Sequence, residues 1–325
     1  LLPFDDINIL REVATGATAK VSLARWRRTE IAVKQFFGIE GADLDTLVKE
    51  CAIHHGLRHP NVVQLLGVCT EPLCLLTEWM ARGSLYGLLH NQQTDLPPDL
   101  RFKLVSDTAR GMHYLHSGNL LHRDLKSKNV LVDSSWNAKV SDFGATTADA
   151  TVHTASILGT LLWCAPELFS RTGQYDQSAD VYSFGIVMWE VWSRRDPYAC
   201  NSDMPKGWAI LGYIQSGNRP LLPPDLSPPL WYRDLYQDCW AGDATSRPTF
   251  NAIVSRLEAA QGNPSLSVPP PDTLDDDTLD DVLDRPGRCP ISVGVEMSSV
   301  GQSPSLAPPL SDDKDDMDTA HSTAP

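Results

Sequence analysis

Hydrophobic and polar positions alternate over the first part of the chain in a way that favours β-strands. Residues 7–13 (INILREV), 19–27 (AKVSLARWR) and 29–37 (TEIAVKQFF) combine this alternation with β-branched side chains, which is typical of half-buried strands. Residues 43–57 instead carry apolar positions at helical spacing, namely Leu44, Leu47, Val48, Cys51 and His55. Two further strands are predicted in VVQLLGVCT and LCLLTEW. The pattern therefore predicts a strand-rich unit that contains one helix.

Helical periodicity dominates after residue 84. Four stretches show it: 100–118, 180–193, 231–240 and 249–261. The chain is thus predicted to be an α+β protein with a small antiparallel lobe (about 1–77), a connector (78–84) and a larger, mainly helical lobe (85–261).

Composition changes abruptly at residue 262. Residues 262–325 contain none of the 25 aromatic residues, ten of the 24 prolines and a charge of −10 out of the total −14. Such a segment buries too little apolar surface to offset the entropy of ordering, so it is predicted to be a disordered Pro/Ser/Asp-rich tail. A solvated spacer and a regulatory tail for Ser/Thr modification or partner docking both remain open.

The charge and the cysteines limit the class of protein. Residues 1–261 carry a charge of −4, which argues against nucleic-acid binding through a basic surface. The seven cysteines form no C-x-x-C pair, which favours reduced thiols in the cytoplasm. The most apolar helical stretch, VYSFGIVMWEVW, is too short to span a bilayer. The chain begins with Leu1 rather than Met, so an upstream membrane anchor, and with it the cytoplasmic region of a receptor, stays open.

Several short polar motifs carry candidate chemistry. In LLHRDLKSKNVLVD (120–133), His122-Arg123-Asp124 is followed five residues later by Asn129. Asp142-Phe143-Gly144 and Ala165-Pro166-Glu167 come next, while Lys34 ends a predicted strand and Glu50 lies on the first helix. Taken singly, each has an ordinary reading: a surface lysine, a solvated helix face, a turn cap or a loop residue bonded to its own backbone.

In this order and spacing, the motifs resemble the signature set of eukaryotic protein kinases over about residues 4–261. The resemblance implies the bilobal kinase fold, with ATP and Mg²⁺ as cofactors and proteins as substrates. It implies that Lys34 contacts the α- and β-phosphates and pairs with Glu50, and that Asn129 and Asp142 hold Mg²⁺. Asp124 would orient the acceptor hydroxyl and take its proton, and Lys126 would contact the γ-phosphate. A transferring phosphoryl group is densely negative, so cations and metal ions are the chemistry it needs.

The resemblance also assigns residues around the adenine and in the scaffold. The backbone of Glu78 and Met80 would bind adenine, with Thr77 at the back of the pocket. Four side chains would contact the nucleotide: Val13, Val21, Ala32 and Leu131. Structural or regulatory roles are implied for Arg123, Phe143, Gly144, Thr160, Glu167, Asp180 and Arg247. Of these, Asp180 would support the backbone of the catalytic loop and Arg247 would pair with Glu167.

The glycine loop departs from the family pattern G-x-G-x-x-G-x-V. Aligned on Val21, the three glycine positions hold Ala14, Gly16 and Ala19. Glycine allows backbone freedom and close approach to phosphate, whereas alanine is tolerable where φ stays negative. We expect weaker nucleotide affinity without loss of catalysis.

The motifs give a mixed indication of the acceptor. Lys126 and Gly159-Thr160 are like serine/threonine kinases, whereas Trp163 and DVYSFGIVMWEVW are like tyrosine kinases. The mixture resembles the tyrosine-kinase-like group, whose members mostly phosphorylate Ser and Thr. A pseudokinase scaffold and a tyrosine or dual-specificity kinase remain alternatives. The hydroxyls between Gly144 and Gly159 predict either a phosphate switch on Arg123 or a plain polar loop.

Overall fold

The computed structural model describes residues 1–16, 19–38, 42–142, 161–169 and 175–261. Phe143, Gly144, Thr160, the hydroxyl-rich segment and the predicted tail lie outside the described residues. The side chains of 42–46 and 49–50, and therefore that of Glu50, also lie outside them.

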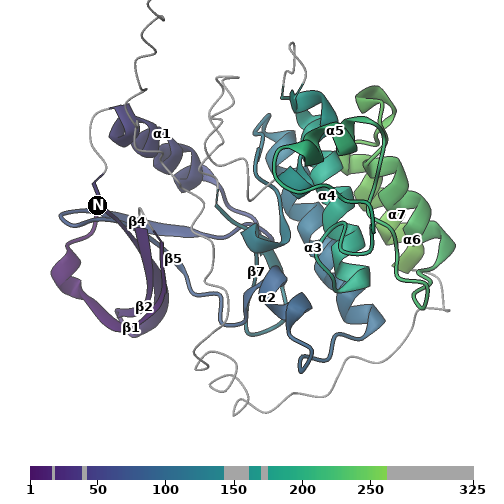
Figure 1. Cartoon of the computed structure of the whole chain (residues 1–325). Helices are drawn as coiled ribbons and strands as arrows, with labels where there is room; N and C mark the ends of the chain where they lie inside the picture. The colour runs from purple at the N-terminus through teal and green to yellow at the C-terminus, as the bar shows by residue number, and fades with distance from the viewer. Residues whose placement is uncertain (17–18, 39–41, 143–160, 170–174, 262–325) are drawn as a thin grey trace, which may run out of the picture.

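The N-terminal lobe is one antiparallel sheet with a helix beside it (Figure 1). Its strands are β1 (Ile7–Thr15), β2 (Ala19–Trp26), β3 (Thr29–Phe36), β4 (Leu65–Thr70) and β5 (Leu73–Glu78), in the spatial order β1-β2-β3-β5-β4. Helix α1 (Ala42–Gly56) connects β3 to β4. The sequence predicted each of these elements, the strands from alternation and β-branched residues and α1 from helical spacing.

The C-terminal lobe is mainly helical. It contains α2 (Leu85–His90), α3 (Pro98–Ser117), α4 (Gln177–Ser193), α5 (Ala209–Gln215), α6 (Leu230–Cys239) and α7 (Phe250–Gln261). A small sheet of β6 (Gly83–Ser84), β7 (Val130–Val132) and β8 (Ala138–Val140) lies at its edge toward the first lobe (Figure 1). The α+β class with two lobes is confirmed.

Three features of the C-terminal lobe were missed by the sequence pattern. Helices α2 and α5 have six and seven residues, which is too short for a period of 3.6 to stand out. Ser84 caps α2 by accepting a hydrogen bond from Gly87 N. Gly83 and Ser84 already pair with β7, so the segment between the two sheets is 79–82, shorter than the predicted 78–84.

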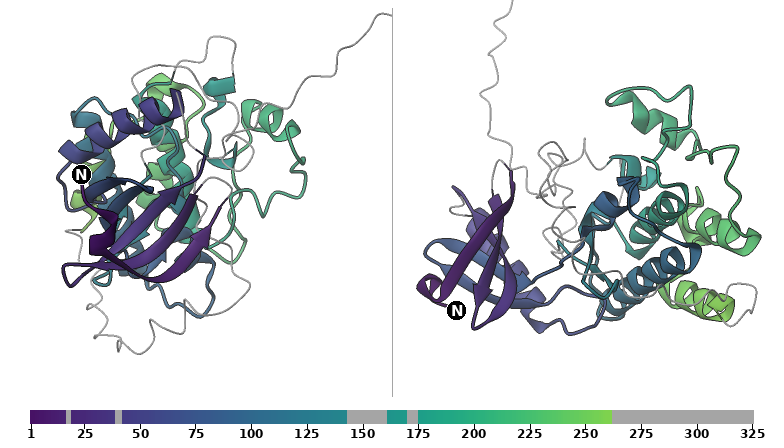
Figure 2. Two further views of the ribbon diagram at one scale, coloured as in Figure 1. Left: turned by 90° about the vertical axis from the view of Figure 1, so that its left-hand side faces the viewer. Right: turned by 90° about the horizontal axis from the view of Figure 1, so that it is seen from below.

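Helix α4 is the centre of the larger core. Fourteen of its seventeen residues are buried, and it packs against α3 and α6 within the helical lobe (Figure 2). A Cβ at Gly185 would lie 2.9 Å from Cys239 Cβ and 3.0 Å from Tyr236 O, so glycine permits the close approach of α6. The six cysteines that the structure describes are free thiols.

Segment 61–63 joins the two lobes. Val140 N donates to Asn61 O (2.9 Å), Val63 N donates to Val140 O (2.9 Å), and Asn61 Nδ2 donates to Ala138 O (3.0 Å). These bonds fix β8, and the residues that follow it, against the N-terminal lobe.

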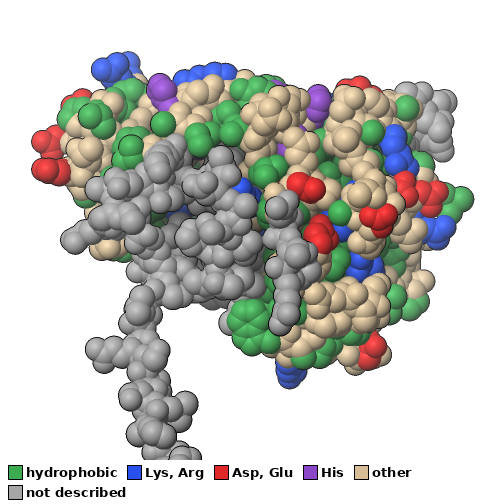
Figure 3. Space-filling model, turned by 90° about the horizontal axis from the view of Figure 1, so that it is seen from above, with side chains coloured by type: hydrophobic (Ala, Val, Ile, Leu, Met, Phe, Trp, Pro, Cys, Tyr) green, Lys and Arg blue, Asp and Glu red, His purple; other side chains and the backbone are tan. Residues whose placement is uncertain are grey.

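On the face shown in Figure 3, acidic and basic side chains are interspersed rather than separated by sign.

Candidate active site

The catalytic loop, residues 122–129, turns three predicted side chains toward one another. A short 3-10 turn at Ser127–Asn129 leads directly into β7. Asp124 Oδ2 accepts a hydrogen bond from Asn129 Nδ2 (2.9 Å) and lies 2.8 Å from Lys126 Nζ. Asn129 Nδ2 also donates to Asp124 O (2.8 Å). Within the described part of the chain, Asp124 Oδ1 has no hydrogen-bond donor and is the oxygen left to accept a proton.

A buried carboxylate on α4 holds the backbone of this loop. Asp180 is fully buried and accepts hydrogen bonds from His122 N (2.9 Å) and Arg123 N (3.0 Å). His116 Nε2 (2.8 Å) and Tyr175 Oη (2.5 Å) complete its set of donors. Burial alone would raise the pKa of Asp180, but these partners outweigh it and hold the pKa below its usual 3.8. The support of the catalytic loop by Asp180 is therefore present.

Removing this charge is expected to destabilise the fold in a pH-dependent way. Asp180→Asn should lower the free energy of unfolding by about 2 kcal/mol at pH 7, because charged hydrogen bonds are lost. The stabilisation from a carboxylate with a lowered pKa is complete above the unfolded value and is lost as pH falls through the folded one. Urea unfolding should thus show a constant deficit from about pH 8 to 5 that shrinks below 3.8. A deficit that grows on acidification would contradict this account.

Lys34 and Asp142 form an ion pair between the lobes. Lys34 lies on β3 and Asp142 follows β8, and Lys34 Nζ lies 3.1 Å from Asp142 Oδ1. Burial disfavours the charged carboxylate, but Lys34 and Lys126 together hold the pKa of Asp142 below its usual value. The φ of Asp142 is +61°, a left-handed conformation that is uncommon outside glycine. The predicted contact of Lys34 with Glu50 lies outside the described side chains.

The oxygen atoms of Asn129 and Asp142 fit a magnesium ion. Ser141 N and Oγ both bond to Asn129 O (2.9 Å each), which places Asp142 next to Asn129. Asn129 uses its amide nitrogen on Asp124, so Oδ1 is left as a ligand. Mg²⁺ is commonly bound by one or two side chains together with phosphates and water. Within the described residues, no group of three or more His, Cys, Asp or Glu side chains could hold a metal ion by itself.

Several of the predicted adenine contacts lie on neighbouring strands of the N-terminal sheet. Ala32 on β3 lies opposite Thr77 on β5, and Val21 on β2 lies opposite Lys34. The side chains of Val13, Val21, Ala32 and Leu131 are all partly exposed, unlike the buried residues that flank most of them. The Glu78 carboxylate is engaged by Lys139 Nζ (2.6 Å) and Gln64 N (2.8 Å), and Met80 is buried. The backbone from Thr77 to Met80 is thereby held in place.

The two alanines of the glycine loop face inward. Ala14 and Ala19 are 5% and 0% exposed, and neither has a positive φ. Gly16 N donates to Ala19 O (2.8 Å), closing the turn between β1 and β2. Ala19 packs with Phe36 and Leu47. Backbone strain therefore gives no reason for the weaker nucleotide affinity expected from the sequence, which stays a prediction.

Restoring glycine tests what the alanines contribute. We expect Ala19→Gly to lower the free energy of unfolding by about 1 kcal/mol through lost packing and added chain entropy. The KM for ATP should fall by no more than about threefold, because the methyl group points into the core rather than toward the phosphates. Thermal unfolding and ATP titration measure both values. A tenfold lower KM would show that loop freedom limits binding.

The predicted partner of Arg247 is also in place. Arg247 Nη1 and Nη2 donate to Glu167 Oε1 (2.6 Å) and Oε2 (2.8 Å) in a bidentate pair. The Arg247 side chain is fully buried, and it also donates to Ser178 O (3.0 Å) and Ala241 O (2.9 Å). It therefore ties the segment after residue 160 to α4 and to the connection before α7.

Comparison with known families decides what this arrangement is. Residues 7–257 match the family model described as protein tyrosine and serine/threonine kinase. The chain belongs to the protein kinase family. The match covers nearly all of the described residues, and the family uses ATP and Mg²⁺ in general.

Curated relatives of this kinase domain carry serine/threonine kinase names. The chain is 39% identical over 290 residues to the probable serine/threonine-protein kinase drkD and 40% identical over 259 residues to drkA, both of Dictyostelium discoideum. It is 36% identical over 258 residues to the dual specificity protein kinase pyk3 of the same organism. These matches cover 83%, 78% and 79% of the chain but only 22%, 39% and 19% of the relatives. The chain thus spans well under half of their length.

Sequence reasoning missed several residues that hold the site of this kinase domain together. Tyr175 and His116 complete the shell around Asp180, and Ser127 bonds to Glu190 on α4. Tyr175 and His116 belong to no motif, and Ser127 stands inside the motif 120–133 without an assigned role. Their partners are 5, 64 and 63 residues away. One signal was available for Glu190, since it is the only charged residue in VYSFGIVMWEVW and a buried acid needs partners.

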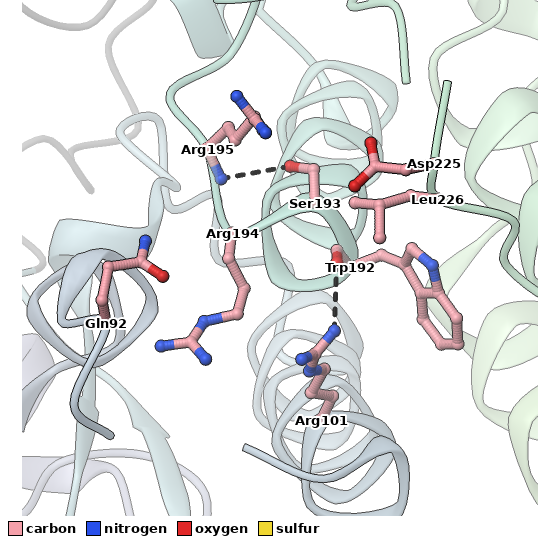
Figure 4. A pocket seen from close by; sticks show the side chains of 8 residues that line it. All are labelled: Gln92, Arg101, Trp192, Ser193, Arg194, Arg195, Asp225 and Leu226. Carbon is pink, nitrogen blue, oxygen red and sulfur yellow. Dashed lines mark hydrogen bonds between the residues drawn. The ribbon is translucent and has the colours of Figure 1, made fainter. Parts of the chain in front are cut away.

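A cavity of about 470 Å³ lies at the far end of α4 (Figure 4). Arg101 donates to Trp192 O and Leu96 O, and Arg194 donates to Leu88 O, Leu89 O and Asn91 O. These arginines thus satisfy carbonyl groups at the C-terminal ends of α2 and α4. None of the predicted site residues lines this cavity.

Among the described residues, no helix has both the length and the apolar character of a membrane span.

Proposed function

We propose that this kinase domain is an active enzyme that transfers the γ-phosphate of Mg·ATP to Ser and Thr hydroxyls of protein substrates. The observation that carries the proposal is the Asp124 carboxylate. Its Oδ2 is held by Lys126 and Asn129, and its Oδ1 is left to accept a proton. This arrangement supports the role of general base for Asp124.

The other residues supply binding and charge. The oxygens of Asn129 and Asp142 are suited to hold Mg²⁺, which would supply positive charge against the phosphates. Lys34 and Lys126 add two positive charges beside Asp142. Arg123, through its backbone N–H on Asp180, keeps the loop in position.

The acceptor class is supported by the relatives and by Lys126. Two of the three relatives described above are named serine/threonine kinases, and one is named a dual specificity kinase. Lys126 contacts Asp124 directly, beside the point where the acceptor hydroxyl must lie. We also propose that the domain works on the cytoplasmic side of the cell, either free or as the cytoplasmic region of a receptor.

The second candidate is a pseudokinase scaffold, which the loss of two loop glycines favours. Against it stands the arrangement of Lys34, Asp124, Asn129 and Asp142, because a scaffold has no need for charged groups matched to phosphoryl transfer. A tyrosine or dual-specificity kinase is the third.

A transfer assay separates these candidates. The full chain is incubated with Mg²⁺, radiolabelled ATP and a mixture of generic protein acceptors, and the labelled products are hydrolysed to phosphoamino acids. We expect phosphoserine and phosphothreonine. Phosphotyrosine would overturn the acceptor class. The absence of any label, with nucleotide binding intact, would favour the scaffold.

A further inference from the structure

Glu190 is a fully buried carboxylate inside the most apolar helix of the chain. It lies on α4, ten residues after Asp180, and neither the predicted chemistry nor the family resemblance uses it. An ionised group in such a position is costly unless specific partners compensate it. Its partners therefore show what it does.

Two hydrogen bonds link Glu190 to two different functional segments. Ser127 Oγ donates to Glu190 Oε1 (2.7 Å), and Trp163 Nε1 donates to Glu190 Oε2 (3.0 Å). Both donors are buried, with exposed fractions of 0% and 2%. Each carboxylate oxygen therefore serves one segment.

No arginine or lysine side chain lies within salt-bridge distance of Glu190 among the described residues. The nearest titratable partner is His90 on α2, whose Nε2 lies 3.5 Å from Oε1. Burial accordingly raises the pKa of Glu190, although His90, Ser127 and Trp163 act in the opposite direction. An apolar residue at position 190 would pack without the desolvation cost of a buried carboxylate, so the carboxyl group is retained despite that cost.

The Ser127 bond acts on the reacting groups. Ser127 directly follows Lys126, which contacts Asp124, and stands two residues before Asn129, which contacts Asp124 as well. A shift of Ser127 would therefore move both partners of the Asp124 carboxylate.

The Trp163 bond acts on segment 161–164. Trp163 O also accepts from Ser183 Oγ (2.8 Å), so the residue is tied to α4 at two points. The charges of Asp124 and Lys126 both influence the next residue, Cys164. Segment 161–164 thus lies in the neighbourhood of Asp124 and Lys126.

We propose that Glu190 is a positioning residue for phosphoryl transfer, which sets the catalytic loop through Ser127 and the facing segment 161–164 through Trp163. This proposal rests on the proposed kinase function. It predicts an effect on the rate of the chemical step, whereas a purely structural role predicts an effect on stability alone. Asp180 fixes the start of the catalytic loop, and Glu190 fixes its end.

The test compares four single variants of the full chain. Glu190→Ala removes both bonds and Ser127→Ala removes one. Glu190→Gln is the conservative variant, since its amide can accept from Trp163 and donate to Ser127. Ser193→Ala is the matched control, because Ser193 is also a buried serine on α4, and its hydroxyl contacts backbone atoms, Glu190 O (3.5 Å) and Arg195 N (3.3 Å), rather than the Glu190 carboxylate.

We expect Glu190→Ala and Ser127→Ala to lower kcat about tenfold or more with the KM for ATP unchanged. Glu190→Gln should stay within about threefold of the unsubstituted chain, and Ser193→Ala should leave kcat unaltered. Wild-type kcat in Ser127→Ala and Glu190→Ala, measured per folded molecule, would overturn the proposal. So would a fall in kcat for Ser193→Ala that equals that of Ser127→Ala.

A second measurement does not depend on activity or on the folding of Glu190→Ala. Hydrogen exchange of residues 122–129 should become faster in Ser127→Ala than in Ser193→Ala. Equal exchange in the two variants would overturn the proposal even if the unsubstituted chain showed no transferase activity. An inactive chain in which exchange differs as expected would instead count against the proposed function alone.

Discussion

Replacing Asp124 by asparagine is expected to lower kcat about 10²–10⁴-fold while the KM for ATP stays unchanged. Asparagine keeps the size of the side chain and can still accept the hydrogen bond from Asn129. It cannot take a proton, and it leaves Lys126 without its carboxylate partner 2.8 Å away. The measurement is the initial rate of label transfer as a function of ATP concentration.

Asp133→Asn is the matched control for this variant. Asp133 lies in the turn between β7 and β8, where it accepts hydrogen bonds from Ser135 N and Asn137. The same change of charge there should leave kcat within about threefold of the unsubstituted chain. Residual activity above one tenth in Asp124→Asn would remove Asp124 from the role of general base.

Asp142→Asn is expected to lower kcat about 10²–10³-fold and to raise the Mg²⁺ concentration needed for half-maximal rate. Two effects combine: the metal loses an anionic ligand, and Lys34 loses the carboxylate that lies 3.1 Å from its Nζ. Lys34 would then be drawn toward the phosphates even without the metal.

Rates measured over a range of Mg²⁺ concentrations at saturating ATP check this prediction. Asp176→Asn serves as the control, since Asp176 caps α4 by accepting a hydrogen bond from Ser178 N and has no predicted role in metal binding. If Asp142→Asn left the Mg²⁺ dependence unchanged, the assignment of Asp142 as a metal ligand would be wrong.

The elements that could be predicted from the sequence are those with a long, regular pattern. Strands such as Thr29–Phe36 alternate because β3 buries one face, and α3 repeats its apolar positions over twenty residues. Short elements could not be predicted in the same way. Helix α5 has seven residues and a glycine at its centre, so its position depends on packing against the rest of the lobe.

In the candidate site, too, some features could be predicted from the sequence and others could not. Asp124, Asn129 and Asp142 stand at fixed spacings in motifs, so the residues could be named before their geometry was known. The contact of Lys34 with Asp142 joins residues 108 positions apart, and no local pattern encodes it. Three of the four donors around Asp180 and both donors around Glu190 come from distant segments, whereas Tyr175 is five residues from Asp180. An acidic residue in an apolar stretch indicates that hydrogen-bond donors are needed, but tertiary packing determines which donors those are.

The most direct test is a crystal structure of the full chain with Mg²⁺ and a non-hydrolysable ATP analogue. The account predicts a metal ion bound by Asn129 Oδ1 and Asp142, with Lys34 Nζ on the phosphates. Asp124 Oδ1 should face the space beyond the γ-phosphate. A nucleotide bound elsewhere, or a metal ion held without Asn129 and Asp142, would contradict the account.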